Sequence, residues 1–373
     1  MASIEPGVLL KTGDKVYLMK TAGITGNATL VNSSHVQQGY SLQYDLTLVQ
    51  DPTDVYATIN AIDLNPQTKS FVEGRLAGLA LLNQGADMVA DQGMSSAMAA
   101  VDQLEGRTTL FGTVAGSSNR YDTGSKIDLD GFGVMVGAAR REGQAAGAAF
   151  IETGWGNYDS YNTFNNAPSV HGDGNTKYYG VGVLGRYDFK NGLYLDGSAR
   201  IGKTKTDFTG KNFYNTDGER AHYNSKVTYV SAHAGLGYIL PVNELTKLDL
   251  SAKYLWTRQG SDSVNIGGDP INFDSENSHR TRLMAKVLRQ VTPQLNISGA
   301  LGYEYEFDGK ARATAYRIYQ IDEPSLKGGT GIGEIGLEYK PQTNQRLSLE
   351  AKLTGYVGQR DGIGGLFRMN YRF

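Results

Sequence analysis

The sequence predicts a membrane protein of the all-β class: a transmembrane barrel of twelve antiparallel strands with a single α-helix through its lumen. Three observations predict it. Twelve segments after residue 107 alternate apolar and polar side chains with the two-residue period of a strand. Short and long connections between these segments alternate as well, which is typical of outer-membrane barrels. A helical segment, residues 69–101, precedes the first strand.

The composition excludes several other classes. The 373 residues carry 36 Lys and Arg against 38 Asp and Glu, so the net charge of −2 gives no basic surface for nucleic acid. Cysteine is absent, which excludes disulfide scaffolds, Cys-ligated metal sites and thiol nucleophiles. No stretch reaches the ~18–20 consecutive apolar residues that a transmembrane helix needs. We expect neither a cofactor nor a metal ion.

Residues 1–65 are expected to form a short β-rich segment. Taken alone, this segment is explained most simply as an ordinary β-meander. No signal peptide opens the chain, because its first residues contain neither a basic nor an apolar run. Either a cytosolic protein or a piece of a longer exported precursor fits that start. The strand-like runs lie at 16–22, 39–49 and 54–60.

Residues 66–106 are expected to form a linker that is mainly helical. The stretch 69–101 is rich in Ala, Leu and Met and lacks proline, and at ~1.5 Å per residue it would be roughly 50 Å long. It retains four glycines, each costing about 1 kcal/mol relative to alanine, which indicates a need for a slim profile. The alternative is a core helix of a soluble α+β domain. The residues expected to face the lumen or keep the helix slim are Glu73, Arg75, Gly78, Asn83, Asp87 and Asp91.

Residues 107–373 are expected to form the barrel itself. In one segment, for example, Leu347, Leu349 and Leu353 share one face, and Glu350 and Lys352 share the other. Each segment supplies the roughly 9–11 tilted residues that are needed to cross a bilayer. The predicted strands are 107–119, 126–140, 143–158, 174–190, 192–206, 222–241, 245–260, 275–291, 293–308, 327–341, 345–360 and 363–373.

The connections strengthen this prediction. Turns such as 190–192 and 241–244 are short, whereas polar loops separate the other strand pairs, except for a short final connection at 361–362. A soluble β-sandwich has no reason for such regular alternation. A membrane barrel has one, because its periplasmic turns are short and its extracellular loops are long. The predicted loops lie near 119–125, 159–173, 207–221, 261–274 and 309–326.

The polar face of the strands carries many charges, which need water or partners inside a membrane. A twelve-stranded barrel has a lumen wide enough for about one helix, and the slim, polar helix at 69–101 is the expected occupant. If the short turns are periplasmic, that helix ends at the periplasmic opening of the barrel, and residues 1–65 lie outside the cell. The charges expected to face the lumen are Arg186, Arg200, Arg282, Glu304, Glu334, Glu338, Glu350 and Lys352.

The end of the chain completes a resemblance. Phe367, Met369, Tyr371 and Phe373 place an apolar or aromatic side chain at every second position up to the last residue. With the twelve strands and the helix, the chain resembles the translocator unit of classical autotransporters, the type V secretion system. The resemblance implies an extracellular passenger, of which residues 1–65 would be the truncated, autochaperone-like end.

The resemblance also implies location and partners. A monomer is expected in the outer membrane of a Gram-negative bacterium, embedded in the lipid bilayer. Its partners would be its own passenger, periplasmic chaperones and the β-barrel assembly machinery, which would recognise the terminal strand by β-augmentation. No nucleic acid is expected among them. The implied function is export and surface anchoring of the protein's own N-terminal passenger.

We do not expect an enzyme. Some members of the family release their passenger through an Asn-Asn pair in the lumenal helix, but here Asn83 is followed by Gln84. An acid role for Asp87 or Asp91 stays open. Two alternative functions also stay open: an outer-membrane porin or channel with a helical plug, and an outer-membrane barrel hydrolase. The five histidines lack a Ser-centred motif or metal-ligand spacing around them.

Overall fold

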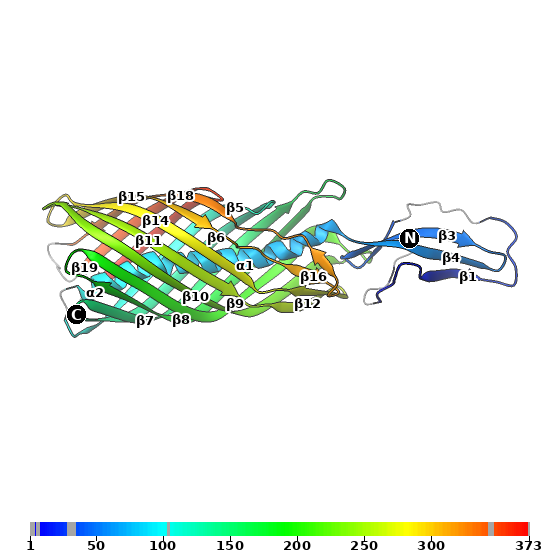
Figure 1. Ribbon diagram of the computed structural model, residues 1–373, viewed down its shortest axis with the longest axis horizontal. Coiled ribbons are helices and arrows are strands. Elements are labelled where there is room, and N and C mark those ends of the chain that lie inside the picture. The colour runs from blue at the N-terminus through cyan, green and yellow to red at the C-terminus, as the bar shows by residue number, and fades with distance from the viewer. Residues whose placement is uncertain (1–3, 5–7, 28–34, 103–104, 342–346, 372–373) are drawn as a thin grey trace.

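The structure is a computed structural model that describes residues 4, 8–27, 35–102, 105–341 and 347–371, without the side chains of 369–371. Figure 1 shows an elongated molecule in which a barrel surrounds a helix and a small sheet projects beyond one end of the barrel. The barrel end next to this small sheet is called the mouth. The opposite end, where the short connections lie and the C-terminal strand ends, is called the turn end.

The projecting sheet, called the stub, contains four antiparallel strands in the order β1-β4-β3-β2. Leu42, Tyr44 and Ile59 form a small buried cluster of the stub, and Tyr316 and Tyr319 of a barrel loop pack against this cluster. The stub strands are β1 (Lys15–Lys20), β2 (His35–Gln38), β3 (Leu42–Gln50) and β4 (Asp54–Leu64).

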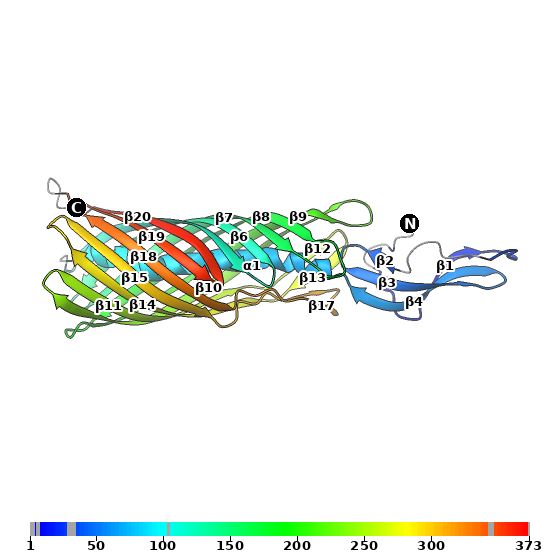
Figure 2. The ribbon, with the colours of Figure 1, turned by 90° about the horizontal axis from the view of Figure 1, so that it is seen from above.

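Strand β4 leads directly into the helical linker, which runs through the barrel from the mouth to the turn end (Figure 2). The side chain of Asn65 accepts a hydrogen bond from the backbone N–H of Gln67 and so caps the first turn. The single predicted helix is interrupted by a π-helical segment, a feature often found at functional sites. Its parts are η1 (Pro66–Thr68), α1 (Lys69–Asp87), η2 (Met88–Gly93) and α2 (Met94–Val101).

Twelve antiparallel strands form the closed barrel, which confirms the predicted fold class. Strand β20 closes it on β5, in a register that runs from Arg360 opposite Tyr121 to Phe367 opposite Val114. The barrel strands are β5 (Thr108–Asp122), β6 (Lys126–Glu142), β7 (Ala145–Asn162), β8 (Val170–Asp188), β9 (Leu193–Tyr214), β10 (Arg220–Asn243), β11 (Thr246–Gln259), β14 (Glu276–Gln290), β15 (Leu295–Glu306), β18 (Gly328–Tyr339), β19 (Leu347–Gly358) and β20 (Arg360–Tyr371).

Several predicted loops are wrong in extent. The expected loop at 207–221 is mostly strand, because β9 and β10 continue pairing well past the length that a bilayer requires. The expected connection at 361–362 lies within β20, and the turn falls at Gln359 instead. The loops at 261–274 and 309–326 fold into a second small sheet at the mouth, made of β12 (Asp262–Ile266), β13 (Asp269–Phe273), β16 (Ala313–Ala315) and β17 (Tyr319–Ile321).

The outer face of the barrel is apolar, as contact with lipid requires. Leu301, Ile335 and Leu353 each expose more than 60% of their surface. Exposed aromatic side chains lie toward the ends of the strands, where bilayer interfaces favour them: Tyr187, Phe189, Tyr238, Tyr254, Tyr303, Phe307 and Tyr339. Among the described residues, no helix is both long enough and apolar enough to cross a membrane.

The inner face is less uniformly polar than the sequence predicts. Ile127, Leu129 and Met135 on β6 point inward and are buried against the helix, whereas Asp130 and Phe132 point outward. One apolar cluster surrounds α1 toward the mouth, and a second surrounds α2 at the turn end. Buried charged side chains lie beside the first cluster and, around Asp87 and Asp91, between the two clusters.

Candidate functional site

The candidate site is the interface between the lumenal helix and the inner wall of the barrel. The helix passes close to the wall where its glycines lie. A Cβ atom on Gly78 would come within 2.7 Å of Thr206 Oγ1, and one on Gly85 within 2.5 Å of the Tyr178 hydroxyl. These approaches are closer than real Cβ atoms tolerate. The lumen therefore requires small residues at these positions.

The first of four main contacts, counted from the mouth, is an ion pair made by Arg75 of α1. Its guanidinium forms two hydrogen bonds to the Glu276 carboxylate, of 3.0 and 2.8 Å, and a third of 2.8 Å to Ser225 Oγ. Both Arg75 and Glu276 are almost fully buried. A pair this buried leaves an uncompensated charge if either partner is lost, so it fixes the helix at one depth.

The second contact uses a charge of the barrel wall against the helix backbone. Arg200 of β9 forms an ion pair of 2.9 Å with Glu152 of β7, and Tyr229 donates to the same carboxylate at 2.6 Å. The Arg200 guanidinium also donates to the backbone carbonyl of Leu82. This wall cluster contacts the helix without any charged helix residue.

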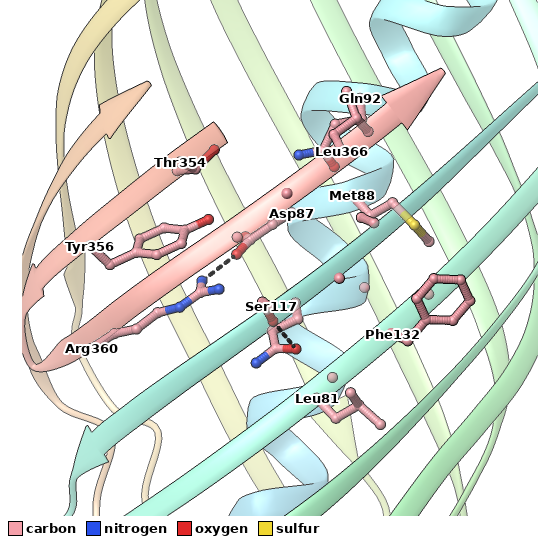
Figure 3. A pocket seen from close by; sticks show the side chains of 18 of the residues that line it. Leu81, Asp87, Met88, Gln92, Ser117, Phe132, Thr354, Tyr356, Arg360 and Leu366 are labelled. Carbon is pink, nitrogen blue, oxygen red and sulfur yellow. Dashed lines mark hydrogen bonds and ion pairs between the residues drawn. The ribbon is translucent and has the colours of Figure 1, made fainter. Parts of the chain in front are cut away.

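The third contact is a buried cluster around Asp87, at the end of α1. Three arginines from two strands, β14 and β20, converge on this carboxylate, with Arg280 at 2.7 Å, Arg282 at 2.6 Å and Arg360 at 3.0 Å. Glu304 of β15 neutralises part of that positive charge through ion pairs with Arg280 and Arg282. Figure 3 shows Arg360 reaching Asp87 from the strand that closes the barrel, beside a cavity of about 50 Å³.

The fourth contact lies in the π-helical segment. Asp91 forms ion pairs of 2.5 Å with Arg282 and 3.0 Å with Lys253. Lys253 Nζ also donates to the backbone carbonyl of Ala90 at 2.6 Å, which satisfies a carbonyl in the segment where the α-helical ladder is interrupted. A polar cavity of about 130 Å³ borders Asp91 toward the turn end.

The other predicted helix residues have smaller roles. Glu73 is buried and accepts a hydrogen bond from Thr123, and the Asn83 side chain donates to Ser278 at 3.0 Å. Of the predicted wall charges, Arg200, Arg282 and Glu304 contact the helix or its ion pairs. Four others line the polar cavity: Arg186, Glu334, Glu350 and Lys352. Glu338 neither contacts the helix nor lines this cavity. It is half-buried and forms an ion pair of 3.4 Å with Lys340.

Four charged wall residues that carry the site were missed: Glu152, Glu276, Arg280 and Arg360. A signal existed for Arg280, which has the same strand parity as Arg282 and lies two residues away. Arg360 was placed at the end of one strand, whereas it is the first residue of the next, β20; Glu276 was placed near the start of a strand and is the first residue of β14. Sequence alone could not show that Arg280 and Arg360 face the same helix turn, or that Glu276 faces Arg75.

A further polar row in the wall was also missed. Ser198 of β9 and His233 of β10 are direct cross-strand neighbours, with Ser198 Oγ 2.5 Å from His233 Nδ1. His233 Nε2 lies 3.1 Å from Asp196 Oδ1. The side chains of His233 and Asp196 each expose only 2% of their surface. The described residues include no group of three or more His, Cys, Asp or Glu that could hold a metal ion.

The predicted assembly signal is only partly described. Phe367 points outward and is half exposed on β20. Met369 and Tyr371 belong to β20, but their side chains lie outside the described part of the structure, and Phe373 lies outside it entirely. The role of these residues therefore stays a prediction.

A closed twelve-stranded barrel with an apolar exterior and an ion-paired helix in its lumen defines a class: outer-membrane barrels whose pore is filled by the protein's own chain. Comparison with protein families identifies the class more closely, because the model of the autotransporter β-domain matches residues 110–353. The match spans more than half of the chain, and the chain belongs to the autotransporter β-domain family. Among curated proteins, none matches the sequence.

Solved structures show the same fold. The translocator domain of the autotransporter NalP from Neisseria meningitidis has a TM-score of 0.58 at 15% identity, covering 78% of this chain and 98% of that chain. The β-domain of the Bordetella autotransporter BrkA has a TM-score of 0.54 at 15% identity, covering 71% of this chain and 99% of that chain. The transport unit of the autotransporter AIDA-I from Escherichia coli has a TM-score of 0.54 at 14% identity, covering 83% of this chain and 100% of that chain.

Proposed function

We propose that this chain exports its own N-terminal passenger across the outer membrane and then anchors it, with residues 1–65 at the cell surface. Residues 66–106 serve as the lumenal linker and residues 107–373 as the barrel. The assembly machinery and periplasmic chaperones bring the barrel into the membrane, where it works as a monomer. Its role as an outer-membrane translocator follows from its family. We propose the positions of the three parts: residues 1–65 outside the cell, 66–106 in the lumen and 107–373 in the membrane.

The observation that supports the proposal most is the match between helix and wall along the lumen. Arg75, the Leu82 carbonyl, Asp87 and Asp91 each meet a wall charge of opposite or complementary character. A helix shifted by one turn would move about 5.4 Å and leave these charges unpaired in a buried site. The lumen is thus built for this one segment of chain in one position, as the end state of export requires.

The same match disfavours a porin. A diffusion channel needs a water-filled path, whereas the two cavities described beside the helix measure only about 50 and 130 Å³. The passenger is proposed to stay attached. Asn83 is held by Ser278, and Asp87 and Asp91 are both paired with arginine, so neither carboxylate is poised as an acid.

A hydrolase is disfavoured as well, although Ser198, His233 and Asp196 resemble a catalytic triad in composition. The side chains of His233 and Asp196 are almost fully buried inside the barrel, and Asp196 also lies 3.8 Å from Lys253. We expect a fluorophosphonate probe to leave the intact protein unlabelled. Labelling that disappears in Ser198→Ala would support the hydrolase function instead.

Because the chain has no cysteine, its orientation can be tested with single introduced thiols. Thr47→Cys places a thiol on the exposed face of the stub, and Lys190→Cys places one in a short connection at the turn end. In intact Gram-negative cells, a membrane-impermeant maleimide should label the first variant, and the second only after permeabilisation. The reverse pattern would contradict the proposal.

A further inference from the structure

The barrel mouth holds a second specific contact, separate from the lumenal ion pairs. The tight turn between β2 and β3, residues 39–41, is inserted between the start of the helix and the small sheet formed by the barrel loops. We propose that this turn is an intramolecular ligand of the barrel mouth, and that its docking on Asp269 locks the stub in place when export is complete. This inference rests on the proposed function.

The recognition centre is the Asp269 carboxylate at the start of β13. Its Oδ2 accepts hydrogen bonds from two successive backbone N–H groups of the turn, those of Tyr40 at 2.7 Å and Ser41 at 2.8 Å. Successive N–H groups next to a residue in the left-handed region form a concave anion site, and Gly39 has a φ of +54°. Asp269 is fully buried, and no described Lys or Arg forms an ion pair with it. Its charge is therefore balanced chiefly by these N–H donors.

The fit between the turn and the loops is close. A Cβ atom on Gly39 would overlap the Asp269 carboxylate, and one on Gly267 would come within 2.6 Å of the Tyr40 ring. The Tyr40 side chain is buried and packs edge-on against Phe71 and Phe213, with ring centroids 6.1 and 5.4 Å away. Its hydroxyl donates to the Glu219 carbonyl at 2.9 Å.

The barrel side of the contact carries backbone strain. Tyr316 and Arg317, in the tight turn between β16 and β17, have φ values of +53° and +61°, which are uncommon for residues other than glycine. This conformation brings the Tyr316 hydroxyl to Asp269 Oδ1 at 2.7 Å. Strain of this kind persists only where surrounding contacts hold it, and here it orients the carboxylate toward the stub.

One residue links docking of the turn to seating of the helix. Asn65, which caps η1, also donates from its side chain to the Tyr40 carbonyl at 2.9 Å and from its backbone to the Ser41 carbonyl at 2.8 Å. These bonds continue the pairing of β3 with β4 and join the turn to the start of the helix, so the turn reaches Asp269 only when the start of the helix has reached the mouth. Docking therefore signals that the lumenal segment is fully in place.

The test measures docking in the purified full chain. Nitroxides on Thr47→Cys in the stub and Lys327→Cys beside the barrel loops, both exposed positions, report the distance between the two parts. The parent should give one narrow distance distribution. Asp269→Ala and Tyr40→Ala should each broaden it about twofold or more, since the turn is then free to leave its site. Asp274→Asn removes an exposed charge from the same loop and should leave the distribution unchanged.

A distribution that stays narrow in both Asp269→Ala and Tyr40→Ala would overturn the inference. Barrel formation is checked by the shift in gel mobility between heated and unheated samples. If Asp269→Ala does not form a barrel, Asp269→Asn, which retains the shape and removes the charge, is judged by the same criterion. The measurement needs no export, so its failure is distinct from failure of the maleimide test of orientation.

Discussion

Asp87 on the lumenal helix and Arg360 on the strand that closes the barrel form an ion pair of 3.0 Å, although 273 positions separate them in the sequence. Arg280 and Arg282 contact the other oxygen of the same carboxylate. The helix and the closing strand are therefore held by one buried charge. Helix seating and barrel closure are coupled through it.

Asp87→Asn should destabilise the folded protein strongly. It leaves Arg280, Arg282 and Arg360 with two carboxylates, Glu304 and Asp91, to balance them in a buried site, and breaking such a cluster typically costs about 3–5 kcal/mol. Urea unfolding in detergent measures the effect. Asp128→Asn, which removes an exposed ion pair with Arg120, is the control and should change little. Equal effects of the two variants would argue against the cluster.

Gly85→Ala should lower stability, although alanine favours an isolated helix by about 1 kcal/mol. The added methyl group would meet the Tyr178 hydroxyl and the Arg200 guanidinium, and overpacking of this kind costs about 1–3 kcal/mol. Gly333→Ala is the matched control in the barrel wall, where a Cβ has no neighbour within 4 Å. Thermal unfolding of both variants shows whether Gly85→Ala lowers or raises stability. A more stable Gly85→Ala would show that the lumen has room to spare.

Arg75 and Glu276 should show strong energetic coupling. Each single change, Arg75→Met or Glu276→Gln, leaves the other charge or its partners unsatisfied. The double variant should then lose less unfolding free energy than the two single variants lose in sum, by about 0.5–3 kcal/mol. The exposed pair Lys211 and Asp159, at a similar distance of 2.7 Å, should give no measurable coupling. Additive effects at Arg75 and Glu276 would contradict a specific contact.

Alkaline pH should release the docked turn. Burial, with the nearby charges of Glu219 and Asp269, raises the pKa of Tyr40 to about 12 from its ordinary value of 10.0. Because the folded pKa is raised, the contribution of Tyr40 to docking is full below pH 10 and is lost as the pH rises toward 12. Nitroxide distances across this range measure the release. Tyr40→Phe has no proton to lose and should remove this part of the pH dependence.

The barrel could be predicted from sequence because its signals are local and repeated. Leu347, Leu349 and Leu353 alternate with polar residues whatever the rest of the chain does, and the helix is continuous in sequence. The loop sheets could not be predicted in this way. Pairing of β13 with β16 joins Ile271 to Ala315, and nothing within either segment specifies the other.

The site was predictable in kind but not in detail. Charges on the polar strand face were expected to meet the helix. Arg200 and Arg282 do so directly, and Glu304 supports them through its ion pairs with Arg280 and Arg282. Which arginines meet Asp87 depends on the stagger between strands. Arg280 and Arg360 come together only because β14 and β20 approach the same helix turn from different sides of the lumen. Docking of Tyr40 on Asp269 depends on backbone N–H groups, which leave no trace in residue types.

The most direct measurement of the central claim is conductance in a planar lipid bilayer. The claim is that residues 69–101 fill the barrel and are held there by paired charges. The intact protein should conduct poorly, and deletion of residues 69–101 should raise its conductance severalfold while the barrel still forms. An intact protein that conducts as well as the deletion variant would contradict the account.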